Sequence, residues 1–144
     1  MAHSDAGHYA AKHPAARMLN EKISAAVQQK AVDGGISCAD ATAIAEKSGV
    51  DMREVGVTID LLEIRLRQCQ LGLFGFDRRE GGLRPATEVA PDLEKAIREN
   101  LAGGRLSCIS AWQIADGRGL SRIAVSSACE KLKIKIKPCQ LGAF

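Results

Sequence analysis

Four lysines on alternate residues form the most suggestive chemical pattern in this 144-residue sequence: Lys131, Lys133, Lys135 and Lys137. The segment that carries them, residues 106–144, has six Lys and Arg against two Asp and Glu, a net charge of +4. Residues 36–76 have four against six, a net of −2, and the whole chain carries +3. A local row of ammonium groups attracts polyanions even when the total charge is modest. The row therefore predicts phosphate binding, and the alternative is a solvated strand face with no ligand.

Cysteines are the second set of side chains that could do chemistry. Cys38 and Cys69 are separated by the same 31 positions (69 minus 38) as Cys108 and Cys139, and Cys129 is the fifth cysteine. Two thiols per pair could form a metal site or a thiol switch. Zinc sites usually show closely spaced ligand pairs, so we favour small buried core residues instead. We expect five reduced thiols and no cofactor.

Catalysis is not expected. The histidines, His3, His8 and His13, all lie near the N-terminus, and neither a nucleotide-binding P-loop nor a dinucleotide-binding glycine pattern occurs. No apolar run is long enough for a membrane span, and no secretory signal is recognisable, so we expect a cytoplasmic protein with no membrane partner. Aromatic residues make up only 3% of the chain, which argues against a surface that stacks on bases.

An internal repeat sets the architecture that must position these side chains. Residues 36–74 align with residues 106–144 at a constant offset of 70 without a gap, and fourteen of the 39 pairs are identical. Each copy ends in the same Cys-Gln-Leu-Gly box, at 69–72 and 139–142. The sequence therefore predicts two copies of one unit, arranged as an intramolecular pseudo-dimer.

Each copy predicts the same series of elements. Apolar residues at four-residue spacing predict first helices over 19–32 and 91–102, ended by Gly34-Gly35 and Gly103-Gly104. A short extended piece, a second helix (40–48 and 110–117) and a third helix (52–62 and 122–132) follow. Alternating strands are predicted at 64–67 and 134–137.

The second and third helices carry a repeated signature. A small residue where two helices cross, a glycine in the turn and an aliphatic residue in the next helix are the requirements of a helix-turn-helix. Ala45, Gly49 and Val55 meet them in the first copy, and Ala115, Gly119 and Val125 do so in the second.

With this signature the sequence resembles the helix-turn-helix superfamily, and the strand that follows makes it similar to the winged-helix branch. The resemblance implies a mainly α fold with a small β component, made of two tandem winged-helix-like units. It also implies that in each unit the short extended piece before the second helix pairs with the strand after the third helix. In such proteins the third helix of the unit enters the major groove. The base-facing positions implied here are Asp51, Met52, Arg53, Gly56 and Val57 in the first copy, and Ser121, Arg122, Ile123, Ser126 and Ser127 in the second.

The two copies differ in their predicted contribution. Carboxylates on the third helix of the first copy would repel phosphates, so we expect the second copy to dominate, through Ser121, Arg122, Ser126, Ser127 and the four lysines. Arg53 could add a contact. Arg78 and Arg79 could do so from a wing hairpin within 77–90, which is equally well read as a plain linker.

The predicted domains are a flexible tail (1–18), a first repeat (19–76), a linker or wing (77–90) and a second repeat (91–144). The predicted function is that of a small DNA-binding transcriptional regulator. A protein-interaction or scaffold module is the first alternative, since winged helices also dock proteins. A cysteine-based metal or redox sensor is the second. A protein partner and a homodimer stay open.

Overall fold

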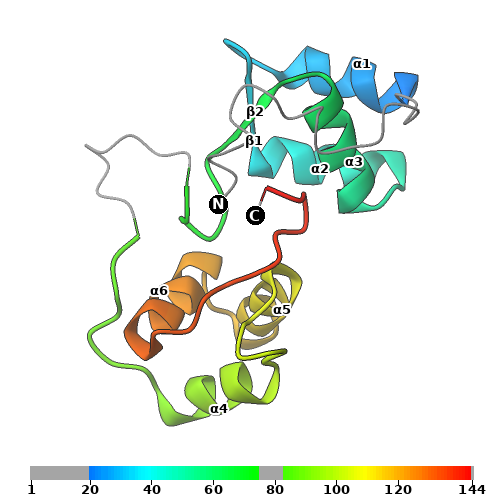
Figure 1. The fold of residues 1–144 in the computed structure, drawn as a ribbon. Coiled ribbons are helices and arrows are strands. Elements are labelled where there is room, and N and C mark those ends of the chain that lie inside the picture. Colours follow the sequence, from blue (N-terminus) through cyan, green and yellow to red (C-terminus); the bar gives the residue numbers. More distant parts are fainter. Residues whose placement is uncertain (1–19, 75–82, 144) are drawn as a thin grey trace. The chain divides into compact units, whose positions relative to one another are not determined.

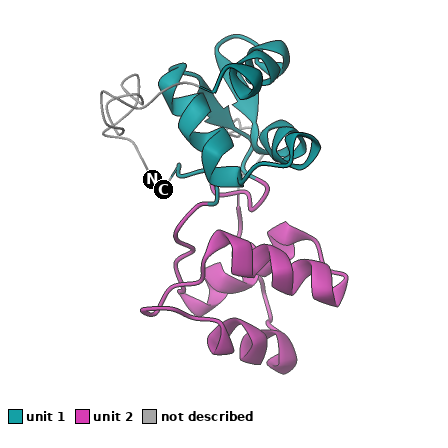
Figure 2. Ribbon diagram, turned by 90° about the vertical axis from the view of Figure 1, so that its right-hand side faces the viewer, with its two compact units in different colours: residues 1–69, 140–144 teal, residues 70–139 magenta. Residues whose placement is uncertain are grey.

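The computed structural model describes residues 20–74 and 83–143, and within them the chain forms six helices and a two-stranded sheet. This confirms a mainly helical protein with a small β component. The chain divides into two compact units (Figure 2). Unit 1 comprises Met1–Cys69 together with Gln140–Phe144, and unit 2 comprises Gln70–Cys139.

Unit 1 contains three helices and the sheet: α1 (Glu21–Lys30), β1 (Gly35–Ser37), α2 (Cys38–Ser48), α3 (Met52–Leu61) and β2 (Arg65–Arg67) (Figure 1). The strand pairing predicted for this copy is confirmed, and it is parallel, with Gly35 opposite Arg65. Parallel neighbours need a crossover connection, which α2 and α3 supply. The buried apolar side chains of this unit are Ile23, Val27, Ile36, Cys38, Ala41, Ile44, Ala45, Val55, Ile59, Cys69 and Leu141.

Unit 2 repeats the helical order with α4 (Pro91–Glu99), α5 (Cys108–Arg118) and α6 (Arg122–Leu132). The strand predicted at 134–137 is reduced to a single parallel bridge between Leu106 and Ile136. The buried apolar side chains here are Leu71, Leu93, Ile97, Leu106, Cys108, Ala111, Trp112, Ile114, Ala115, Val125, Ala128, Cys129 and Ile136.

The turn between the second and third helices forms as its sequence predicts. Gly49 and Gly119 follow α2 and α5 with φ of 65° and 66°, a left-handed conformation that glycine adopts without steric cost. In each turn the next residue's N–H donates to the alanine carbonyl one turn back, from Leu120 to Ala115 at 2.9 Å in unit 2. The aliphatic residues that follow, Val55 and Val125, are fully buried. The glycine turn and the buried valine that the repeated pattern predicts therefore occur in both copies.

The first helices are shorter than predicted. They end at Lys30 and Glu99 rather than at 32 and 102. In unit 1 the following residues form a tight turn closed by a bridge between Val32 and Gly35, with Gly34 at φ 74°. The glycines that were expected to stop the helices therefore belong to the turns after them. The predicted tail (1–18) and the first part of the predicted linker (77–82) lie outside the described residues.

The boundaries of the compact units do not coincide with the ends of the two repeats. Unit 1 ends at Cys69, and the remainder of the first box, beginning with Gln70, belongs to unit 2. The second box divides in the same place, because Cys139 belongs to unit 2 and Gln140–Phe144 to unit 1. Each box is therefore split between its cysteine and its glutamine.

Candidate nucleic-acid interface

The four lysines predicted to bind phosphate are all exposed on unit 2. We call them the lysine ridge: Lys131, Lys133, Lys135 and Lys137. The ridge begins in the last turn of α6 and continues into an extended segment that lies against Leu106. The Leu106 N–H donates to the Lys135 carbonyl at 3.0 Å, and the Lys137 N–H donates to the Leu106 carbonyl at 2.8 Å. Ile136, between them, is only 8% exposed, so its neighbours on either side face solvent.

Ion pairs neutralise the helix cations of unit 2 but not the ridge. The pairs are Lys95–Glu99, Arg98–Glu94, Arg118–Asp92 and Arg122–Asp116. Within residues 20–74 and 83–143 no ridge lysine takes part in an ion pair. The acidic residue adjoining them in sequence is Glu130, which is exposed. Among the described residues of unit 2, the exposed cations without an ion pair are therefore the four ridge lysines, Arg84 and Arg105.

The corresponding positions in unit 1 are Leu61, Glu63, Arg65 and Arg67. Arg67 donates from Nη2 to the Asp33 carbonyl at 3.0 Å. Its side chain lies so close to Gly35 that a Cβ there would overlap the guanidinium group. Arg65 alone projects from this segment as an exposed cation. The basic ridge is therefore a property of the second copy.

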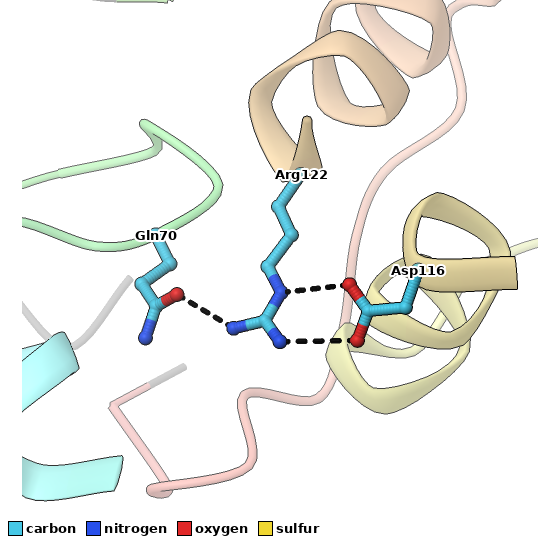
Figure 3. A network of polar contacts seen from close by, with 3 residues as sticks. All are labelled: Gln70, Asp116 and Arg122. Carbon is cyan, nitrogen blue, oxygen red and sulfur yellow. Dashed lines mark hydrogen bonds and ion pairs between the residues drawn. The ribbon is translucent and has the colours of Figure 1, made fainter. Parts of the chain in front are cut away.

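Arg122, the residue predicted to read guanine, is held by three neighbours in unit 2, and Figure 3 shows two of them, Gln70 and Asp116. Its Nη1 donates to Oε1 of Gln70 at 2.6 Å, and its Nη2 and Nε donate to the two carboxylate oxygens of Asp116 at 3.1 and 3.4 Å. The guanidinium carbon also lies 3.8 Å from the centre of the Trp112 ring. The side chain is 27% exposed.

The energies involved argue against a free reading role for Arg122. A partly exposed ion pair contributes about 0.2–1 kcal/mol and a cation–π contact about 0.5–1 kcal/mol. A bidentate arginine–guanine contact discriminates by about 1–3 kcal/mol. Moving Arg122 from Asp116 and Trp112 to a base would thus cost most of the free energy that the contact with the base provides.

The remaining predicted positions on α6 are only partly accessible. Ser126 is fully buried and its hydroxyl has no hydrogen-bond partner among the described residues. Ser127 is half-buried, and its carbonyl accepts from the Ala86 N–H at 3.0 Å. Ser121 is exposed, but its hydroxyl accepts from the Ala124 N–H at 3.1 Å as the N-cap of α6. Ile123 is 46% exposed. The segment before α4 and the first box therefore cover part of this helix.

The third helix of unit 1 is covered in a related way. Gly56 is buried, and a Cβ added there would overlap the carbonyl oxygen of Leu141, which belongs to the same unit. Leu141 itself is 4% exposed. Asp51 and Arg53 are exposed, whereas Met52 and Val57 are half-buried. Of the predicted positions on α3, Arg53 is the exposed cation. The predicted wing residues Arg78 and Arg79 lie outside the described residues.

Four of the five cysteines are buried, as expected for core residues, and Cys139 is the exception. Cys38, Cys69, Cys108 and Cys129 are buried, and Cys139 is half-buried. Burial, followed by the charge of Glu130, raises the pKa of Cys129 to about 11. No group of three or more metal-ligating side chains occurs in residues 20–74 and 83–143.

Sequence reasoning missed one cation beside the ridge. Arg105 is exposed and directly precedes Leu106, the residue against which the ridge segment lies. Its counterpart at the offset of 70 is Gly35. The alignment of the two copies therefore shows a large cation at a position where the first copy has no side chain, and this difference could have identified Arg105.

Comparison with known proteins found no matching family model, no matching curated protein and no matching solved structure. The described helices include none that is both long and apolar enough to cross a membrane.

Proposed function

We propose that this protein binds nucleic acid, and that the lysine ridge of unit 2 supplies its main contacts to phosphates. The two units would be winged-helix-like helix-turn-helix modules, as their Ala–Gly–Val signatures suggest. The single observation that carries the proposal is that four exposed lysines on alternate positions of one segment are free of ion pairs among the described residues, whereas Lys95, Arg98, Arg118 and Arg122 each face a carboxylate. Phosphate neutralisation by such cations dominates nucleic-acid affinity.

The proposal changes the role first expected of α6. Insertion of this helix into a major groove would require Arg122 to leave Asp116 and Gln70, and would require the buried Ser126 to become accessible. We therefore assign binding to the end of α6 and the segment after it, and assign Arg122 to the packing of unit 2.

Salt dependence tests the proposal directly. Each neutralised phosphate on a duplex contributes about −0.9 to the slope of log K against log salt. The four ridge lysines thus contribute about −3.6 to the slope, measured by fluorescence anisotropy with a labelled DNA fragment. Lys135→Gln should reduce the slope by about 1.

The first copy offers a matched control. Arg65→Gln removes the exposed cation at the position equivalent to Lys135, and it should leave the slope unchanged. A salt-independent affinity, or an equal effect of the two substitutions, would refute binding through the ridge.

A protein-docking module is the second candidate, because one observation favours it. The backbone of Leu141 packs so tightly on α3 that only glycine fits at position 56. Leu71, the equivalent residue of the first box, is fully buried in unit 2. Both units thus hold a Gln-Leu-Gly turn. A pull-down at high salt, where phosphate contacts are screened, would separate this candidate from the first.

A further inference from the structure

Arg105 and Lys135 are neighbours in register on the exposed side of unit 2. Leu106 and Ile136 form a parallel bridge and both point into the core, at 0% and 8% exposure. Successive side chains of an extended segment alternate between its two faces. The residues one position earlier, Arg105 and Lys135, therefore face solvent together, and both are exposed.

The difference between the two copies explains why the cations of unit 2 stay free. In unit 1 the Arg67 guanidinium lies over Gly35, where there is no side chain to prevent it, and donates to the Asp33 carbonyl. Position 105 carries an arginine instead of a glycine. Lys137, the counterpart of Arg67, is exposed, and no contact of its side chain is observed among the described residues.

We propose that Arg105 joins the lysine ridge to form a two-strand basic surface, with Arg105 on one of the two bridged segments of unit 2 and the ridge on the other. This surface binds the backbone of duplex nucleic acid without reading bases. The inference rests on the proposed function. In an extended segment, alternate residues are about 6.6 Å apart. That step is close to twice the roughly 3.4 Å axial spacing of phosphates on one strand of a duplex. Lys135 and Lys137, which lie on the extended part of the ridge, are thus spaced to meet phosphates along one regular strand. Lys131 in the last turn of α6 and Lys133 directly after it add positive charge beside them.

Two further observations specify the partner. Sequence readout needs side chains that reach base edges, and on α6 Arg122 is bound to Asp116 while Ser126 is buried. Single-stranded ligands are typically held by exposed aromatic rings. The aromatic side chains in residues 20–74 and 83–143 are Trp112, which is 8% exposed and stacked under Arg122, and Phe74, which is half-buried. The surface therefore fits a duplex backbone better than a single strand or a specific site.

The test compares three labelled ligands of equal length with the full-length protein: two duplexes of unrelated sequence and one single strand. Five phosphate contacts predict that affinity for both duplexes falls by about 500-fold between 50 and 200 mM salt. We expect equal affinity for the two duplexes, within about twofold, and weaker binding of the single strand with a shallower slope, about −0.7 per contact.

Variants at position 105 test the new residue. Arg105→Gly installs the residue of the first copy, and it should lower the ratio of affinities at the two salt concentrations by about threefold. Arg105→Lys keeps the charge and should restore the ratio. Arg118→Gln, which removes an ion-paired cation on α5, is the control that should leave it unchanged.

The outcomes separate the two proposals. No binding to any ligand at low salt would overturn the proposed function itself. Binding with a strong preference for one duplex sequence or for the single strand would keep the function and overturn the duplex-backbone inference. An unaltered ratio in Arg105→Gly would remove Arg105 from the surface and with it the two-strand site.

Discussion

Arg122 has the residue type and the position expected of a side chain that reads a base, but its contacts lie within unit 2. Its position at the start of the third helix predicts a base contact by resemblance, yet its guanidinium group bonds Asp116 and Gln70 and stacks on Trp112. None of these partners adjoins Arg122 in the sequence, and Gln70 is 52 residues away. Such an assignment could not be made from the sequence because it depends on which side chains the packing of unit 2 brings together.

We therefore expect Arg122→Ala to affect stability rather than binding. Loss of the ion pair, the glutamine contact and the cation–π contact should lower the free energy of unfolding by about 1–2 kcal/mol, as measured by urea denaturation. Affinity for DNA should stay within about twofold of the wild-type value. A large loss of affinity in a variant of normal stability would return Arg122 to the reading role.

Cys129 makes the stability of the protein sensitive to alkaline pH. Burial raises the pKa of its thiol to about 11 in the folded state, above the ordinary value of 9.0. Between these values the unfolded chain releases a proton that the folded chain keeps, so stability falls as pH rises through this range. Cys129→Ala should make the pH profile flatter over the same range in thermal unfolding experiments. Identical profiles for the two proteins would contradict a contribution from this thiol.

Among the elements, the turn after the second helix is the part most fully predictable from sequence. The alanine, glycine and valine positions of both copies impose local geometry, since a left-handed residue is required where the chain reverses between two closely packed helices. The ends of the first helices were less predictable, because glycine pairs suit both a helix end and the tight turn that follows it. The strand of the second copy was overpredicted for a related reason. Alternating apolar residues indicate that one face of a segment is buried, but in unit 2 this segment forms a single bridge, with Leu106.

Two glycines close together in α5 and its turn give a matched test of this element. Gly119 has φ 66°, so Gly119→Ala should lower the free energy of unfolding by about 1–2 kcal/mol. Gly117 lies within the helix, and an added Cβ there meets no atom within 4 Å, so Gly117→Ala should raise stability by about 0.5–1 kcal/mol. Urea denaturation of both variants gives the comparison. Equal effects of the same sign would contradict a left-handed turn at Gly119.

At the scale of the whole molecule, the repeat was evident from sequence but the division of the boxes was not. Identity between the copies shows that each unit is built alike. It does not show which unit receives which box, because Leu71 and Leu141 occupy equivalent positions in the alignment. The compact units assign Gln140–Phe144 to the unit of α1, α2 and α3. Residues from the end of the described chain thus stabilise the helices at its beginning.

This arrangement predicts a long-range effect of one substitution. Leu141 is 4% exposed in unit 1, so Leu141→Ala should lower the free energy of unfolding by about 2–4 kcal/mol. Hydrogen exchange should show the loss of protection in α3, which ends 80 residues earlier in the sequence (141 minus 61). Loss of protection confined to the residues around 141 would contradict the assignment of this segment to unit 1.

The central claim is that unit 2 binds nucleic acid through the ridge after α6 rather than through the face of α6. Titration of the isotope-labelled protein with a short duplex, followed by amide chemical shifts, tests it most directly. We predict that the largest changes fall at residues 131–137 and at Arg105, while residues 122–127 change little. The largest changes within 122–127, with the ridge unaffected, would contradict the claim.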